Sequence, residues 1–599
     1  MIRNDILKKI TLNKHLYRQS IFYSIEKGVA PEKIFNTVNN VPDLSDFPFP
    51  LPCEKSRYCC CDKSDNGVLW LGSDCGVTRI DPDAEFDFDR VMYFSADRDL
   101  PDNNVKAVAA DGEGAWVLTE TGITHIEMVM LSPEDVAAKL LDETLSIVER
   151  QGMVSQRYLA KAGELDTALP HANSDNDGGF TALFSIAEIM RYACYKKEFG
   201  TESEKTREAK AVAVKALEAC LLLMYIHGRG DGFIARTYLF DGEPVPDDGF
   251  FFKRQGNKAV CVANSESVEK GVVGAVSDCS AEVPERLRYL YEDKGKTLDD
   301  IIYKADTSSD EVTIQLLNCL FAHKYLTEDE PELDNLIKES VKGIVNHIID
   351  NGFVLKDFHG GPTTWARWDN DYFNGQVEGW ADAPLNAAEI LFYLKTVMEI
   401  TGEKGKWLQT YESLINEHGY ADLTEKHFDR LYQMCLALGV DYQSEIMYGD
   451  HMLATCSFFG LCTMEKDEKL LRKYRKGYEA WRSSIGPEHN PGYDFLYALA
   501  NPDDDIDMER IREWFLRFNL SRLASGVSLI GRHDVAVKEL RDNYNQISVL
   551  LPPDERFISK YDRDPLRYTN VDSGGNMCVE SCFVYTFAYW IGRYFGFIE

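Results

Sequence analysis

Acidic side chains gather directly before two apolar segments of helical period. The first group lies in His171-Ala-Asn-Ser-Asp-Asn-Asp177, ahead of the segment that starts at Gly178. Asp175 or Asp177 there could activate or orient a water molecule. The competing interpretation is structural, because an acid at a helix start caps the helix and suits its dipole. One cap needs one acid, so the surplus acid keeps the functional hypothesis open.

The second group opens another apolar segment, in Asp306-Thr-Ser-Ser-Asp-Glu-Val-Thr313. We expect Asp310 to act as a general acid, since a carboxyl group aimed into aromatic surroundings has a raised pKa. Glu311 is a second catalytic candidate. Ser308 and Glu311 also fit the S-x-x-E pattern of a capping box, which would explain Glu311 without any chemistry.

Aromatic and cationic side chains share the Gly/Pro-rich stretch 360–372. Trp365 and Trp368 could stack on the apolar faces of sugar rings, and Arg367 could bind a carboxylate with two hydrogen bonds. The alternative is a lid whose tryptophans pack on the protein. Tyr372 follows as a further substrate-binding candidate.

Two isolated residues complete the expected site. Arg236, in Gly232-Phe-Ile-Ala-Arg236, could hold a substrate carboxylate or hydroxyl groups. His451 precedes another apolar segment, with Asp450 directly before it as a lesser candidate, although a single histidine is more often structural than a base. No dinucleotide, Walker, serine-elbow or HExxH motif is present, and no CxxC pair supports a metal site at Cys59–Cys61. We therefore expect neither a metal nor an organic cofactor.

These residues need a scaffold that brings helix starts together. From Ser132 onward the apolar period is helical, and half-apolar segments alternate with almost wholly apolar ones. This alternation predicts a mainly α fold, an (α/α)6 toroid at 129–599 in which outer helices cover inner ones. The outer helices are expected near 133–150, 203–227, 330–350, 404–417, 466–483 and 506–520, and the inner ones near 178–198, 309–326, 384–400, 449–463, 491–499 and 576–595. An extra helix is expected near 423–438, and loops 241–300 and 352–382 are long enough to be functional.

A short β-rich module is expected at 1–128. The segments 67–81 and 114–127 look like copies, each with a tryptophan strand, a turn and a second strand that begins at glycine. Their alternation and spacing predict two β-hairpins of propeller type. Two copies cannot close a ring, so the module is a propeller remnant. Its open edges must be covered by the toroid or by a second subunit, which leaves a homo-oligomer as one option.

Bulk composition limits the partners and the compartment. A formal net charge of −33 argues against nucleic acid and anionic membranes, because such a field repels both. The N-terminus lacks a signal-peptide core, and no apolar run reaches the ~18 residues that a membrane span needs. The odd count of fifteen cysteines suggests reduced thiols. These features predict a cytoplasmic protein.

Several of these segments resemble an uncharacterised bacterial family. They are 176–181 with 187–193, Asp306-Thr-Ser-Ser-Asp-Glu311, Pro362-Thr-Thr-Trp-Ala-Arg-Trp368 and Tyr589-Trp-Ile-Gly-Arg-Tyr594. In that family, propeller repeats of the two-component-regulator type precede a six-hairpin toroid. The resemblance implies a fold similar to glycoside hydrolases and polysaccharide lyases, without an assigned reaction. Gly179 departs from the larger apolar residue expected there. Fold likeness alone does not settle a function.

The favoured function is a glycoside hydrolase that acts on an oligosaccharide, with a uronic acid in the substrate as one option. Asp310 would be the acid, and Asp175 or Asp177 would work on the water. A polysaccharide lyase is the first alternative, with Tyr372 or His451 as base and Arg367 as neutraliser. A carbohydrate sensor or scaffold without enzymatic activity is the second.

Overall fold

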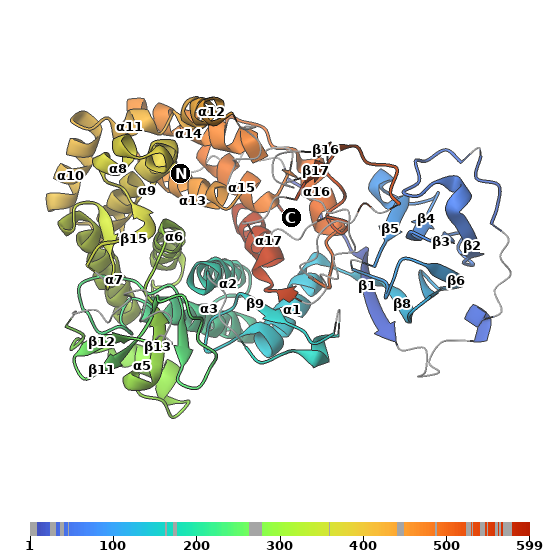
Figure 1. Cartoon of the computed structure of the whole chain (residues 1–599), viewed down its shortest axis with the longest axis horizontal. Helices are drawn as coiled ribbons and strands as arrows, with labels where there is room; N and C mark the ends of the chain where they lie inside the picture. Colours follow the sequence, from blue (N-terminus) through green and yellow to red (C-terminus); the bar gives the residue numbers. More distant parts are fainter. Residues whose placement is uncertain are drawn as a thin grey trace.

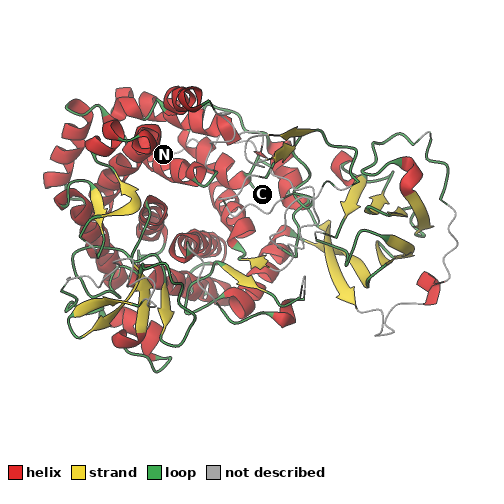
Figure 2. Cartoon of the chain, viewed as in Figure 1, coloured by secondary structure: helices red, strands yellow, loops and turns green. Residues whose placement is uncertain are grey.

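The computed structural model describes most of the chain. The described residues are 9–23, 32–35, 41–45, 47–96, 98–161, 164–171, 176–262, 278–358, 360–439, 448–485, 488–522, 529, 531–539, 545–547, 549–556, 561, 565–566 and 578–599. The protein is mainly helical and has several small sheets (Figures 1 and 2). Within these residues, no helix combines the length and the apolar character that crossing a membrane requires.

The N-terminal part consists of two four-stranded antiparallel sheets. The strands of the first are β2 (Tyr58–Lys63), β3 (Leu69–Ser73), β4 (Gly76–Ile80) and β5 (Val91–Phe94), in that order. The second has the order β1-β8-β7-β6, with β1 (His15–Tyr23), β6 (Val105–Asp111), β7 (Gly114–Thr119) and β8 (Ile123–Leu131). Both predicted hairpins are present as β3–β4 and β7–β8. The strand β1, which we did not predict, pairs with β8 along its whole length.

Six apolar helices follow one another in space. They are α2 (Asp177–Phe199), α6 (Ser309–Tyr325), α9 (Val377–Thr401), α13 (Asp450–Met464), α15 (Pro491–Ala500) and α17 (Phe583–Phe595). Each packs against the next, and α17 packs against α2. Most of their residues are buried, as the apolar sequence segments predict.

More amphipathic helices cover this group. They are α1 (Pro133–Glu143), α3 (Glu204–Leu222), α7 (Pro331–Asp350), α10 (Gly405–Asn416), α12 (His427–Leu438), α14 (Glu468–Ile485) and α16 (Met508–Leu516). For example, α3 packs on α2, and α14 packs on α13. Because apolar periodicity is a local signal, most of the predicted helix positions agree with the observed ones within a few residues. The larger differences are at α9, at α17 and at the ends of several outer helices.

The two long loops contain structure that we did not predict. The first holds part of a sheet of order β10-β13-β11-β12 and the helix α5. The second holds the hairpin β14–β15 and the short helix α8. The bounds are β10 (Tyr238–Phe240), β11 (Phe251–Gln255), β12 (Lys258–Cys261), α5 (Glu285–Glu292), β13 (Ile301–Lys304), β14 (Val354–Lys356), β15 (Pro362–Arg367) and α8 (Asn370–Gly375). The remaining short elements are β9 (Gln156–Tyr158), α11 (Tyr420–Leu423), β16 (Val537–Glu539), β17 (Asn545–Ile547) and β18 (Cys578–Glu580).

A buried ionic network joins the β-rich part to the helical part. Arg18 of β1 donates from Nε to Asp554 Oδ2 (2.8 Å). Arg517, which follows α16, binds the other oxygen of Asp554 (2.8 Å). The neighbouring Glu555 accepts a hydrogen bond from the backbone N–H of Tyr93 in β5 (3.0 Å). The β-rich part therefore packs on the helices through charged groups that water does not reach.

Candidate active site at the starts of the apolar helices

Glu311 lies in the first turn of α6, but it does not form the capping box. The Ser308 hydroxyl makes no capping hydrogen bond. The Glu311 carboxyl group instead lies against the start of α2, where Gly178 and Gly179 leave room for it. A side chain at Gly178 would place its Cβ 2.5 Å from Glu311 Oε2. The glycine pair is therefore required for steric reasons, since a side chain at Gly178 would collide with the Glu311 carboxyl group.

Burial determines the charge of Glu311. Its side chain is fully buried, and burial raises its pKa well above the usual value, although the positive charge of Arg236 opposes the shift. Arg236 is itself held in place. It donates hydrogen bonds to Asn176 Oδ1 and to the carbonyl oxygen of Asp306, the latter at 3.3 Å. Burial thus favours the uncharged form of Glu311, and the arginine whose charge opposes this is already hydrogen-bonded to other groups of the protein.

We expect Gly178→Ala to lower the free energy of unfolding by about 1–3 kcal/mol, because the added methyl group overpacks the contact with Glu311. It would also lie 2.7 Å from Leu223 Cδ1. The matched control is Gly179→Ala, whose Cβ would meet Glu311 Oε1 at 3.3 Å, a contact that a small shift relieves. Urea denaturation of both variants measures the difference, and equal stabilities would contradict the steric role. Adding Glu311→Ala to Gly178→Ala should restore part of the loss.

The first predicted acidic group is structural where the structure describes it. Asp177 is 4% exposed. Its Oδ2 accepts hydrogen bonds from Thr237 Oγ1 (2.7 Å) and from Arg150 Nη2 (3.3 Å). It therefore ties α2 to the neighbouring loop and does not offer its carboxylate to a substrate. Asp175 lies outside the described residues.

Asp310 lies beside Glu311 and is half-buried. It lines a narrow pocket of about 30 Å³ at the first turns of α2, α6 and α13. The other polar side chains of this pocket are Asn176, Glu311 and Tyr561. Asp310 therefore lines the pocket at the helix starts, as expected of a catalytic acid. Asp177 does not line this pocket.

Three further carboxyl groups interact electrostatically with Asp310 or with one another. Asp382 and Glu389 belong to α9, and Asp450 is the first residue of α13. Burial raises the pKa of Asp450 well above its usual value, and the charges of Asp382, Asp310 and Glu389 add to the shift. Burial also raises the pKa of Asp382 to about 6 and that of Glu389 to about 8. Acids from three neighbouring helices therefore share one region in which at least one proton is retained at neutral pH.

The aromatic stretch divides into one exposed and several buried residues. Trp365 is 54% exposed on β15, and the neighbouring Thr364 donates from its N–H and its hydroxyl to Asp306, just before α6. Trp368 is fully buried and donates from Nε1 to Glu389 (2.8 Å). Trp365 can therefore stack on a ligand, whereas Trp368 has no ring face open to a sugar and agrees with the packed-lid alternative.

The other two residues predicted from this stretch are engaged within the protein. Arg367 pairs with Asp369 (3.1 Å), and its guanidinium group lies 4.7 Å from the ring centre of Tyr372. The hydroxyl group of Tyr372 donates to Asp382 Oδ2 (2.8 Å). Tyr372 thus positions one of the clustered carboxyl groups.

His451 also has a structural environment. It is 1% exposed, and its Nε2 lies 3.0 Å from the Ser484 hydroxyl. Burial lowers its pKa to about 3, so the ring is neutral. This agrees with the structural interpretation favoured from the sequence.

Sequence reasoning missed Asp382 and Glu389 and gave Asp450 little weight. The sequence signal that could have revealed them is an acidic residue inside an almost wholly apolar helix. Acidic residues are rarely buried without a partner or a functional role. In the part of the chain that the structure describes, no group of three or more histidine, cysteine or acidic side chains could hold a metal ion.

Comparisons with family models, with curated proteins and with solved structures were made for the whole chain. None of the three returned a match.

Proposed function

We propose that this protein is a glycoside hydrolase built on an (α/α)6 toroid. The packing order supports the toroid, because each of the six apolar helices contacts the next and the last contacts the first. One observation carries the functional proposal. Carboxyl groups from α6, α9 and α13 lie close enough for their charges to act on one another, and burial raises the pKa values of Asp382, Glu389 and Asp450, as a site that must hold a general acid requires.

The roles follow from the protonation states. Burial and the neighbouring carboxyl groups raise the pKa of Asp450, which is half-buried, so it is the group suited to protonate the leaving oxygen. Asp310 lines the adjoining pocket and is suited to act as the base or nucleophile. This assignment moves the general acid from Asp310 to Asp450. Glu389 and Tyr372 hold the surrounding groups in place, since Glu389 accepts a buried hydrogen bond from Trp368 and Tyr372 donates a partly buried one to Asp382.

The proposed substrate is an oligosaccharide without uronic acids. Both arginines that we expected to bind a uronate are already bonded inside the protein, Arg236 to Asn176 and Arg367 to Asp369. The negative charge of Asp382, whose raised pKa of about 6 still leaves it mostly ionised at neutral pH, would also repel a substrate carboxylate. The exposed ring of Trp365 supplies a stacking face for a neutral sugar.

A lyase has less support than a hydrolase. Its base would be Tyr372 or His451, yet the first is hydrogen-bonded to Asp382 and the second is fully enclosed. Burial and the negative charge of Asp382 also raise the pKa of the Tyr372 hydroxyl, which opposes its use as a base.

We expect a panel of neutral oligosaccharides to yield new reducing ends without near-ultraviolet absorbance. A hydrolase leaves a saturated sugar, whereas a lyase leaves a double bond conjugated to a uronate carboxyl group. The panel should include matched uronate-containing oligosaccharides as the control, measured by both readouts. Absorbance that rises with cleavage would establish the lyase instead. Binding of an oligosaccharide with no cleavage would favour the sensor.

A further inference from the structure

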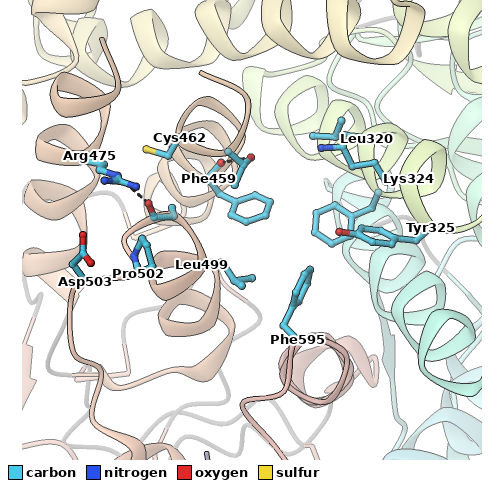
Figure 3. A pocket seen from close by; sticks show the side chains of 13 residues that line it. Leu320, Lys324, Tyr325, Phe459, Cys462, Arg475, Leu499, Pro502, Asp503 and Phe595 are labelled. Atoms are coloured by element: carbon cyan, nitrogen blue, oxygen red, sulfur yellow. Dashed lines mark hydrogen bonds between the residues drawn. The ribbon is translucent and has the colours of Figure 1, made fainter. Parts of the chain in front are cut away.

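A second cavity lies at the opposite ends of the same helices. It has a volume of about 490 Å³ and is lined by the last turns of α6, α13, α15 and α17 (Figure 3). Helix α6 contributes Asp310 at one end and Tyr325 at the other. At 1.5 Å per residue, these positions are roughly 22 Å apart along the axis. The cavity is therefore separate from the proposed catalytic site.

The wall of this cavity is mainly aromatic and aliphatic. Figure 3 shows Phe459, Phe595 and Tyr325 around the opening, with Leu499 between the first two. These side chains come from four helices that are distant in sequence. A volume of this size suits a small organic ligand with an apolar body, and removing such a body from water supplies the main favourable term.

Two cations stand on opposite sides of the opening. Arg475 of α14 donates from Nε to the carbonyl oxygen of Ala500 at the end of α15 (3.1 Å). Across the described residues it forms no ion pair, so the two Nη groups remain available for an anion. Within the described part of the chain, Lys324 of α6 forms one ion pair, a long contact of 3.7 Å with Glu399. A cationic ligand would be repelled from both sides, whereas a carboxylate could bind Arg475 through two hydrogen bonds.

We propose that this cavity binds a small amphiphile with an apolar body and one anionic head group, such as a medium-chain carboxylate. The head group pairs with Arg475 at the rim, with Lys324 nearby, and the apolar body lies among the aromatic side chains. Asp503, which also lines the cavity, is exposed to solvent, so its charge is screened more than that of a buried acid. The proposal does not depend on the glycosidase proposal, because no residue is shared.

Fluorescence titration of the full-length chain with 8-anilinonaphthalene-1-sulfonate tests this directly. We expect saturable binding at one site and displacement by decanoate. Arg475→Gln should weaken binding of the sulfonate probe by about tenfold or more, because it removes the charged partner of the sulfonate group. It should leave the neutral probe N-phenyl-1-naphthylamine almost unaffected, because the apolar wall remains. Leu499→Trp should weaken the binding of both probes, because the larger side chain fills the cavity.

Arg472→Gln is the matched control, since Arg472 lies less than one turn away on α14 and is exposed. It should bind both probes like the parent chain. Thermal unfolding checks that each variant is folded, and Lys324→Gln provides a second charge variant if Arg475→Gln is unstable. The proposal is overturned if the sulfonate probe does not saturate, if decanoate does not displace it, or if it binds equally well after both charge changes.

Discussion

Asp310→Asn and Asp450→Asn are each expected to lower turnover by about 10²–10⁴-fold, with melting temperatures close to that of the parent chain. Asparagine keeps the shape of each side chain but cannot exchange a proton. The stability of Asp450→Asn should hold because burial disfavours the charged form of Asp450, so removing the ionisable group costs little. Steady-state kinetics on an oligosaccharide that the protein cleaves, together with thermal unfolding, measure both quantities.

The two variants should differ in their dependence on the leaving group. A dinitrophenyl glycoside releases dinitrophenolate, which leaves without being protonated. On that substrate Asp450→Asn should therefore recover much of its lost turnover, whereas Asp310→Asn should not. The pH profiles should differ as well. Because the pKa of Asp450 is raised, activity of the parent chain is lost as pH rises through that pKa, and Asp450→Asn should lack this alkaline limb.

Asp371→Asn is the matched control. Asp371 lies in the first turn of α8 near the site, yet its side chain is exposed and has no part in the cluster. It should retain full activity. If Asp310→Asn were as active as Asp371→Asn, Asp310 would have no role in the reaction. A large loss of stability in Asp310→Asn would indicate that its carboxylate serves the start of α6 instead.

The helices could be predicted from the sequence because each carries its signal within its own residues. An apolar segment such as that of α13 indicates a buried helix without knowledge of its neighbours. The strand β1 has no such signal. It becomes a strand because β8 offers a free edge, and the residues that form this edge lie 100 to 116 positions away along the chain.

The site was only partly predictable for the same reason. Ser308 and Glu311 match a capping box, yet Glu311 turns to the space beside Gly178 on another helix, which no local pattern reveals. Likewise, Asp382 and Asp450 belong to segments nearly seventy residues apart, and their importance comes from being close in space. Tertiary contacts decide between the local alternatives that a sequence leaves open.

The network at the boundary of the β-rich part leads to the second large expected effect. We expect Asp554→Ala to lower the free energy of unfolding by about 3–5 kcal/mol, because it leaves the buried guanidinium groups of Arg18 and Arg517 with less compensation. Urea denaturation measures this loss. The control is Asp74→Ala, which removes the exposed partner of Arg57 within the same β-rich part and should cost less than about 1 kcal/mol.

The pH dependence of stability gives an independent check on Asp554. Burial acts to raise its pKa, but the charges of Arg18 and Arg517 outweigh burial and hold the pKa below its usual value. A carboxyl group with a lowered pKa in the folded state stabilises the fold above its unfolded pKa of about 3.9, and this contribution is lost as pH falls through the folded value. The parent chain should therefore lose stability in acid more steeply than Asp554→Ala does. Parallel stability curves for the two proteins below pH 4 would show that the two arginines do not depend on the charge of Asp554, and the network would then be a matter of packing alone.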